Sequence, residues 1–343
     1  MSRHTNLSPL NRLMFVTMVL LTGAMPAMAA DPLNLDNPIV LQRADPWIHR
    51  DDTSGCYYFI GTSPSFDQIE IRNACRLNDL KLAEPVVVWR KRESGPMSAN
   101  IWAPELHRID GVWYIHFAAG DVAKRFSIRM YVLSNSAADP TTGTWQEEGQ
   151  ITTHLDSFSL DATTFEHRGK RYLVWAQQDA ERSYNSALWM AEMDSPVSIS
   201  EPVIRLSEPL LDWEIQGYKV NEGAAVLVRH GRVFMTYSAS ATDDRYAMGL
   251  LWADADADLM NPENWHKSAE PVFTTNPGLG RYGPGHNSFV LAEDGKTDLM
   301  IYHSRDYHEL QGTPLTDPNR HARARPIYWD SQGFPVFLAD QGD

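Results

Sequence analysis

The sequence predicts an all-β fold, a single five-bladed β-propeller. Hydrophobic strands begin at five anchors that recur at steps of 58, 58, 61 and 64 residues. The anchors are Asp45, Ala103, Asp161, Glu222 and His286. A turn glycine and then an aromatic-rich run follow each anchor, as in CYYFIGT and KRYLVWAQ. Repeats of about 60 residues with several short strands each are typical of a radial array of small sheets.

Three of the five anchors are acidic. They lie in the segments RADPWIHR (Asp45), SLDATTFEHRGK (Asp161) and VNEGAAVLVRHGR (Glu222). Because equivalent positions of a radial array meet at its centre, we expect the three carboxyl groups to converge. A single acid at a strand end commonly accepts backbone hydrogen bonds and nothing more. Three acids in register on a repeat instead favour one common site.

The first 30 residues have the features of a signal peptide. Arg3 and Arg12 precede an apolar stretch, Leu13 to Ala24, and Ala27-Met28-Ala29 has the form of a cleavage site. We therefore expect a secreted or periplasmic protein whose propeller spans residues 31–343. The alternatives are an uncleaved anchor or a core helix. Beyond residue 30, no stretch of the sequence is long and apolar enough to span a bilayer, so no membrane contact is expected after cleavage.

The composition suits one large globular domain. Of the 343 residues, 43% are hydrophobic, and a propeller can exceed the usual domain size because each added blade brings its own core. Removal of residues 1–30 leaves 28 basic against 44 acidic groups, a net charge of −16. Such a charge excludes nucleic acid and anionic membranes as partners and favours a neutral polymer.

The two cysteines fall on a predicted hairpin. Cys56 opens one strand and Cys75 closes the next, with the turn SPSFD centred between them. This symmetry makes the two residues cross-strand neighbours, close enough for a structural disulfide in an exported protein. Two free buried thiols are the alternative.

Turn signals divide the rest of the chain. Tight turns are predicted at 167–170, 230–232, 110–111 and 294–296. The segments SAADPTTGTW and DADLMNPENW resemble each other and are predicted to join the third and fourth strands of a blade. The tail IYWDSQGFPVFLAD is predicted to carry one strand pair and to close the ring by pairing with residues near 31–42.

The order of the anchor segments resembles glycoside hydrolase family 43. The matching segments are RADP, WAPE, LDAT, NEG and GPGHNS, and the resemblance covers essentially all of residues 38–340. It implies a five-bladed β-propeller and hydrolysis with inversion of configuration. Within the family the chain looks like the α-L-arabinofuranosidases, including exo-acting enzymes. The implied partner is a plant cell-wall oligo- or polysaccharide, arabinan or arabinoxylan.

The resemblance assigns a role to each acidic anchor. It implies that Asp45 is the general base, that Asp161 raises the pKa of the acid and orients it, and that Glu222 is the general acid. The chemistry itself requires a carboxylic acid and a carboxylate about 6.5–9.5 Å apart, with room for a water between them. The small apolar run 223–226 after Glu222 suits an acid that stays protonated.

Further site residues follow from the same segments. The resemblance places His286 near the channel centre, beside a possible Ca²⁺ or similar ion held mostly by water, although the reaction requires no cofactor. A hydrogen-bonded structural histidine is the alternative. Arginines before the closing strand are candidate substrate contacts, and the sequence does not separate the two. Predicted substrate-binding residues are Trp102, Arg320, Arg323, His286, Asn221 and Tyr218.

Other functions remain possible within this fold. A β-xylosidase or an endo-arabinanase of the same family would use the same acids, and loops 120–130 and 305–319 are expected to decide the shape of the pocket. A carbohydrate-binding propeller without turnover is the alternative of another class. The segment YHSRDYHE, which contains His303, lacks the spacing of a metal site, and no G-x-S-x-G motif of a serine hydrolase is present.

Overall fold

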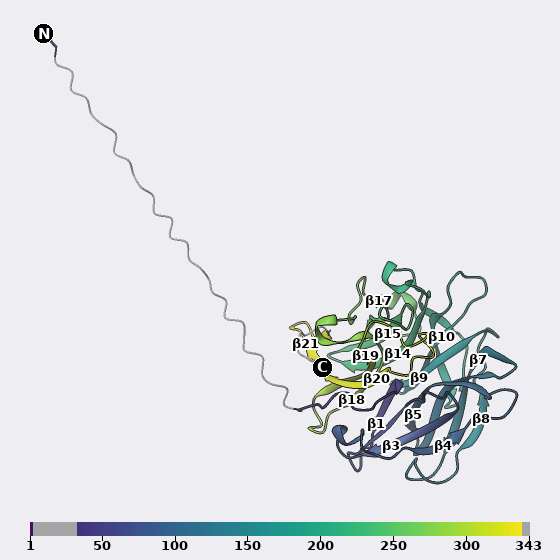
Figure 1. Ribbon diagram of the computed structural model, residues 1–343. Coiled ribbons are helices and arrows are strands. Elements are labelled where there is room, and N and C mark those ends of the chain that lie inside the picture. The colour runs from purple at the N-terminus through teal and green to yellow at the C-terminus, as the bar shows by residue number, and fades with distance from the viewer. Residues whose placement is uncertain (3–32, 338–343) are drawn as a thin grey trace. The chain divides into compact units, whose positions relative to one another are not determined.

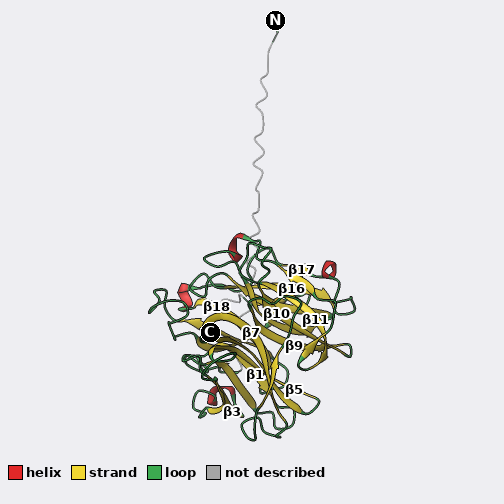
Figure 2. Cartoon of the chain, turned by 90° about the vertical axis from the view of Figure 1, so that its right-hand side faces the viewer, coloured by secondary structure: helices red, strands yellow, loops and turns green. Residues whose placement is uncertain are grey.

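The computed structural model describes residues 1–2 and 33–337 of the chain (Figure 1). The predicted signal peptide therefore falls almost entirely outside the described residues. Residues from Leu35 onward form one compact unit. That unit is built of strands, and the helices among the described residues are short 3₁₀ turns (Figure 2). These are η1 (Leu77–Asp79), η2 (Asp212–Glu214), η3 (Pro262–Asn264) and η4 (Pro277–Leu279).

The strands form five antiparallel blades. Blade 1 contains β1 (Ala44–Arg50), β2 (Tyr57–Thr62), β3 (Gln68–Ala74) and β4 (Val86–Arg90). Blade 2 contains β5 (Ala99–Ile109), β6 (Val112–Asp121), β7 (Lys124–Asn135) and β8 (Gln146–Gln150). Blade 3 contains β9 (Ser159–His167), β10 (Lys170–Gln177), β11 (Ala187–Ser195), β12 (Ser198–Ile199) and β13 (Ile204–Ser207). Blade 4 contains β14 (Asn221–Arg229), β15 (Arg232–Ala239), β16 (Ala247–Asp254) and β17 (His266–Lys267). Blade 5 contains β18 (Tyr282–Leu291), β19 (Asp298–Arg305) and β20 (His321–Pro326).

The first strand of each blade faces the centre of the ring. These inner strands contact one another in the order β1, β5, β9, β14 and β18, and β18 contacts β1. Apolar side chains fill the space between neighbouring blades. Ile60 and Ile69 of blade 1 pack with Ile115 of blade 2, and Val174 of blade 3 packs with Met235 of blade 4. The predicted all-β, five-bladed propeller is confirmed.

The predicted outer connections are also confirmed. Residues 136–145 join β7 to β8, and residues 255–265 join β16 to β17. In both connections the tryptophan at the end folds back on its own turn. Nε1 of Trp145 donates to the carbonyl oxygen of Pro140 (3.1 Å), and Nε1 of Trp265 donates to that of Leu259 (2.9 Å). This shared contact explains why the two segments resemble each other.

The ring closes differently from the prediction. The tail does form a strand pair, β21 (Tyr328–Trp329) with β22 (Pro335–Val336), but these strands pair with each other. The residue that pairs with the N-terminal segment is Ala322 of β20, through an isolated bridge to Val40. The tail instead packs Trp329, Phe334 and Phe337 into the apolar core between blades 4 and 5. Burial of these rings outweighs the edge pairing that the sequence suggested.

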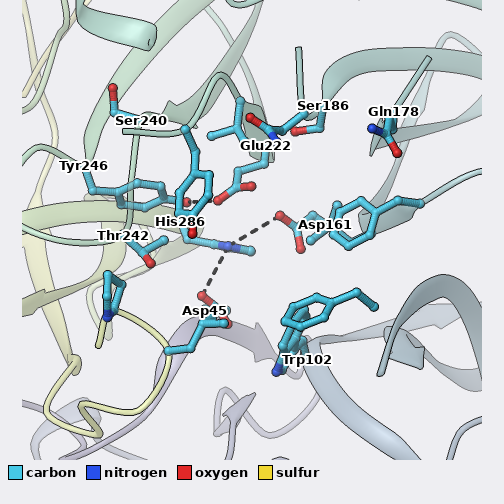
Figure 3. A pocket seen from close by; sticks show the side chains of 18 of the residues that line it. Asp45, Trp102, Asp161, Gln178, Ser186, Glu222, Ser240, Thr242, Tyr246 and His286 are labelled. Atoms are coloured by element: carbon cyan, nitrogen blue, oxygen red, sulfur yellow. Dashed lines mark hydrogen bonds and ion pairs between the residues drawn. The ribbon is translucent and has the colours of Figure 1, made fainter. Parts of the chain in front are cut away.

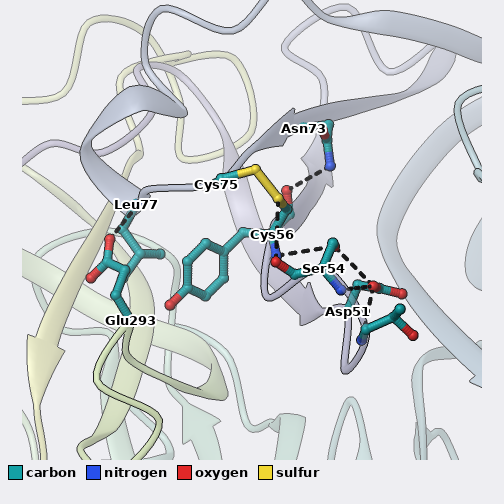
Figure 4. The surroundings of a disulfide bond; sticks show 9 residues. Asp51, Ser54, Cys56, Asn73, Cys75, Leu77 and Glu293 are labelled. Atoms are coloured by element: carbon teal, nitrogen blue, oxygen red, sulfur yellow. Dashed lines mark hydrogen bonds between the residues drawn. A yellow bond between two sulfur atoms is a disulfide. The ribbon is translucent and has the colours of Figure 1, made fainter.

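The two cysteines form a disulfide at the start of the β2–β3 hairpin (Figure 4). Tyr57 pairs with Ala74 across this hairpin, so Cys56 and Cys75 are the next cross-strand pair outward. Their Cα atoms lie 3.9 Å apart. The bond therefore extends the hairpin, as the symmetry about the SPSFD turn predicts.

Candidate active site

A cavity of about 510 Å³ opens at the ends of the inner strands. Asp45, Asp161 and Glu222 all line it, and in Figure 3 their carboxyl groups point toward the same space, with the His286 ring among them. Three different blades thus supply the three acids. The structure brings together the carboxyl groups that the repeat pattern selected.

Each inner strand bulges where it reaches the cavity, and one residue of each bulge has a left-handed backbone. These residues are Asp45 (φ 53°), Ala103 (44°), Asp161 (56°), Gly223 (59°) and His286 (45°). The prediction that Glu222 occupies the same place as the other acids is therefore wrong by one residue. A Cβ atom on Gly223 would lie 3.0 Å from the His286 ring, so only glycine fits at this bulge. Blade 4 consequently supplies its carboxyl group from the preceding residue.

Neighbouring blades hold the left-handed residues in place. In four cases a polar side chain of one blade accepts the backbone N–H of the left-handed residue in the next. The contacts are Thr62 Oγ1 with Ala103 N (2.7 Å), Asp161 Oδ2 with Gly223 N (3.0 Å), Ser238 Oγ with His286 N (2.8 Å) and His303 Nδ1 with Asp45 N (3.0 Å). These bonds satisfy donors that the bulges remove from the sheet ladders.

Asp45 is buried but is surrounded by groups that stabilise its charge. The Thr62 hydroxyl donates to Oδ2 (2.6 Å), and Oδ1 lies 3.3 Å from His286 Nδ1 and 3.4 Å from the Arg320 guanidinium. Burial acts to raise the pKa of Asp45, but His286 and Arg320 outweigh it and lower the pKa to about 2. Burial also lowers the pKa of His286, so Arg320 is the cation that persists at neutral pH.

Glu222 has the opposite electrostatic environment. The Tyr246 hydroxyl donates to its Oε1 at 2.9 Å. Burial, followed by the negative charge of Asp45, raises the pKa of Glu222 to about 7, although the Tyr246 hydrogen bond and Arg320 oppose the shift. Glu222 therefore keeps a proton under conditions in which Asp45 is ionised.

Asp161 is buried beside the Gly223 backbone and the His286 ring. Its Oδ2 accepts the backbone N–H of Gly223 (3.0 Å) and is 3.8 Å from His286 Nδ1. Burial raises the pKa of Asp161 well above its ordinary value, and the charges of Glu222 and Asp45 raise it further. Two carboxyl groups in one buried site resist simultaneous ionisation, so the environment of Asp161 and Glu222 favours a protonated form of the pair.

The predicted substrate-binding residues divide into two groups. Trp102, Arg320, Tyr218 and His286 line the cavity. Trp102 lies in the bulge of β5, and Arg320 directly precedes β20. The structure thereby selects Arg320 over Arg323 as the arginine at the cavity, a choice that the sequence left open.

The remaining two predicted residues do not line the cavity, which corrects the sequence analysis. Arg323 forms an ion pair with Asp306 and does not line the cavity. Asn221 is fully buried, where it hydrogen-bonds to Ser207 and Glu214. Side chains alternate along a strand, so the neighbour of a residue that faces the cavity points elsewhere.

Sequence reasoning missed three residues that contact the acids: Thr62, His303 and Tyr246. Thr62 and His303 fall near the ends of the aromatic-rich runs, where Ser238 also lies, so a repeated polar residue there was a usable signal. Tyr246 follows a turn and has no equivalent in the repeat. Segments 120–130 and 305–319 do reach the cavity, through Phe126 and Leu315, although the first is the end of the β6–β7 hairpin and not the expected loop.

The acids around His286 do not suit a directly bound metal ion. Within residues 33–337 no group of three or more His, Cys, Asp or Glu side chains could hold one. His286 faces Asp45 and Asp161 through a single ring nitrogen, at 3.3 and 3.8 Å. The carboxylates of Asp45 and Asp161 therefore already have His286 as a partner. An ion held through water near His286 stays a prediction.

A carboxylate and a protonated carboxyl group that face one cavity define the class of the protein, a glycoside hydrolase. The chain belongs to the glycosyl hydrolases family 43, whose profile matches residues 35–335. Within the part of the chain that the structure describes, no helix is long and apolar enough to cross a membrane.

Characterised relatives share about half of the residues. The chain is 49% identical over 324 residues to an extracellular exo-α-(1→5)-L-arabinofuranosidase of Streptomyces avermitilis, covering 93% of this chain and 67% of that protein. It is 52% identical over 286 residues to a protein of the same name from Streptomyces chartreusis, covering 83% and 87%. The crystal structure of an α-L-arabinofuranosidase from Lactobacillus brevis superimposes with a TM-score of 0.85 at 49% identity, covering 88% of this chain and 95% of that one.

Proposed function

We propose that this chain is an exo-acting α-L-arabinofuranosidase that releases L-arabinofuranose from arabinan or arabino-oligosaccharides with inversion of configuration. The observation that carries the proposal is the contrast between Asp45 and Glu222. Their pKa values are moved in opposite directions, to about 2 and about 7, in a single cavity. Opposite shifts of this kind support Asp45 as the base and Glu222 as the acid. The names of the relatives support the substrate.

In the proposed reaction Glu222 donates its proton to the glycosidic oxygen as the bond to the anomeric carbon breaks. Asp45 accepts a proton from the water that attacks the opposite face of the sugar. Arg320 and the Thr62 hydroxyl keep Asp45 ionised for this step. Asp161 lies in the same buried site as Glu222, where two carboxyl groups resist simultaneous ionisation, and its bond to Gly223 N–H holds the strand beside the acid.

The walls of the cavity support recognition of a chain end. Phe126 of β7 lines one part of the cavity, and Pro314 and Leu315 line another. Buried Arg305 holds the second wall, because its guanidinium donates to the carbonyl oxygens of Thr242 (2.8 Å) and Pro314 (3.1 Å). An endo-arabinanase needs room for sugar units on both sides of the cleaved bond, which such walls restrict. A β-xylosidase remains an alternative with the same acids.

Export is part of the proposal. The features of residues 1–30 and the word extracellular in the names of the Streptomyces relatives support a secreted or periplasmic enzyme. N-terminal sequencing of the protein from culture medium and periplasm tests this. We expect the mature chain to begin near residue 31, and a full-length N-terminus would contradict export by cleavage.

Sugar release tests the activity. We expect arabinose from aryl α-L-arabinofuranosides and from arabinan, with little xylose from aryl β-xylosides. Glu222→Gln and Asp45→Asn should each lower kcat on oligosaccharides by about 100-fold or more, because each removes one proton-transfer group. Glu309→Gln, a change at an exposed carboxylate, is the matched control. A folded wild-type protein that binds arabinan without turnover would instead identify a carbohydrate-binding propeller.

A further inference from the structure

Tyr246 contacts the proposed proton donor directly. The residue precedes β16, is 1% exposed, and its hydroxyl donates to Oε1 of Glu222 at 2.9 Å. Figure 3 shows the ring lying beside the cavity with its hydroxyl toward this carboxyl group. A carboxylic acid carries its proton on one oxygen, and the other oxygen is the better acceptor. The Tyr246 hydroxyl therefore distinguishes the two oxygens of Glu222.

The Tyr246 ring has no freedom to leave this position. It stacks on the imidazole of His303 with ring centroids 5.8 Å apart and planes 5° apart. On β18, a Cβ atom at Gly285 would lie 2.4 Å from Cε1 of Tyr246, so a side chain there would displace the ring. The second glycine of the GPGHNS segment thus makes space for Tyr246. This contact explains why position 285 is a glycine, which the repeat pattern alone does not explain.

We propose that Tyr246 is a positioning residue for the proton donor, an inference that rests on the function proposed above. By occupying Oε1 of Glu222, the phenol leaves Oε2 as the oxygen that carries the transferable proton. In the reaction this proton moves to the glycosidic oxygen, the bond to the anomeric carbon breaks, and the attacking water gives its proton to Asp45. Tyr246 keeps its own proton, and its hydrogen bond to Oε1 strengthens as Glu222 becomes charged.

Four other titratable groups line the cavity with Glu222 and Tyr246. They are Asp161 of β9, Asp45 of β1, His286 of β18 and Arg320 before β20. Burial and Asp45 raise the pKa of Glu222, whereas Tyr246 and Arg320 lower it. Loss of the phenol alone should therefore raise this pKa further and weaken the acid.

The test is Tyr246→Phe in the full chain, which keeps the ring and its stacking and removes the hydroxyl. Rates are measured on aryl α-L-arabinofuranosides of decreasing leaving-group acidity and on arabino-oligosaccharides. Loss of a hydrogen bond to a developing charge should lower kcat on oligosaccharides by about 10- to 100-fold. Dinitrophenyl substrates need no proton at the leaving oxygen, so they should lose less than about threefold. The basic limb of kcat/KM should move to higher pH.

Tyr237→Phe is a matched control. The Tyr237 hydroxyl also donates to a buried glutamate, Glu214, at 2.8 Å, but neither residue lines the cavity. This variant should melt at a lower temperature with an unchanged leaving-group dependence.

The inference would be overturned if Tyr246→Phe lowered kcat equally for all leaving groups and left the alkaline side of the kcat/KM profile in place. A packing defect would give that result. Failure of the proposed function looks different. If the wild-type chain turns over aryl β-xylosides and no arabinofuranoside, the proposed substrate is wrong, and the same comparison on the xyloside series still tests Tyr246.

Discussion

The backbone N–H of Gly223 donates a 3.0 Å hydrogen bond to Oδ2 of Asp161. The residue that follows the proposed acid in sequence is thereby bonded to the carboxyl group of the neighbouring blade. This bond couples the backbone conformation of β14 in blade 4 to the charge of Asp161 in blade 3. It also holds Gly223 in the left-handed position that the repeat pattern had assigned to Glu222.

Gly223→Ala should therefore impair catalysis more than its size suggests. The new Cβ would lie 3.0 Å from the His286 ring, and the left-handed backbone costs a non-glycine residue about 1 kcal/mol. We expect kcat to fall at least about tenfold, since a small misplacement of catalytic groups has large effects. Gly231→Ala is the control, because Gly231 is also left-handed but has no atom within 4 Å of the added Cβ. Equal kcat values for the two variants would contradict the argument.

The pH dependence of kcat/KM should be asymmetric. Activity requires ionised Asp45, which is lost only as pH falls toward about 2, and protonated Glu222, which is lost as pH rises through about 7. We expect a plateau in the mildly acidic range and a decline of about tenfold per pH unit on the alkaline side. Arg320→Gln removes the lasting positive charge beside Asp45 and should move the acidic limb upward. An acidic limb that stays in place would show that Arg320 does not stabilise this carboxylate.

The wall formed by residues 313–315 depends on buried Asp317. Its carboxylate accepts backbone N–H groups from Gln311 (2.8 Å) and Asn319 (3.0 Å) and the Tyr307 hydroxyl (2.9 Å). Asp317→Ala should free this segment, raise KM for arabino-oligosaccharides several-fold and add internal cleavage of arabinan, with little change in kcat on aryl substrates.

Product sizes measured by chromatography check the Asp317 prediction. Asp330→Ala is its control, because Asp330 organises a turn in the same way through the N–H groups of Gln332 and Phe334, but no residue of that turn lines the cavity. If Asp317→Ala still releases only arabinose, the wall does not determine exo action.

The disulfide should stabilise the fold without affecting catalysis. Cys56 and Cys75 are separated by 19 residues, and closure of a loop of this size contributes about 3 kcal/mol through the unfolded state. The double variant Cys56→Ser, Cys75→Ser should lower Tm by a few degrees in a thermal melt. Its kcat at 25 °C should match wild type, because neither cysteine lines the cavity. A loss of kcat in the folded variant would assign the bond a further role.

Metal removal should have little effect on the rate. Asp45 and Asp161 contact the His286 ring, and the described residues offer no group of His, Cys, Asp or Glu side chains that could hold a metal ion directly. Dialysis against EDTA should leave kcat within about twofold, since catalysis here needs only proton transfer between carboxyl groups. A larger loss that Ca²⁺ restores would favour an ion held through water beside His286.

The repeat in the sequence determined much of this protein. Five anchors at nearly constant steps predicted five blades, and the acids at three anchors predicted a shared cavity, because radial symmetry brings equivalent strand ends together. The hairpin of Cys56 and Cys75 followed from local symmetry alone. These features depend on period and on neighbours in sequence, which a single sequence displays.

Only the tertiary structure decided which side chains touch the acids. Whether Glu222 or Gly223 occupies the bulge depends on the His286 ring of the next blade, and Tyr246 reaches Glu222 from a turn that has no counterpart in the repeat. Arg320 faces Asp45 while Arg323, three residues later, pairs with Asp306. Such choices depend on the direction in which each side chain leaves its strand and on contacts between blades that are distant in sequence. The repeat pattern of the chain reveals neither of these.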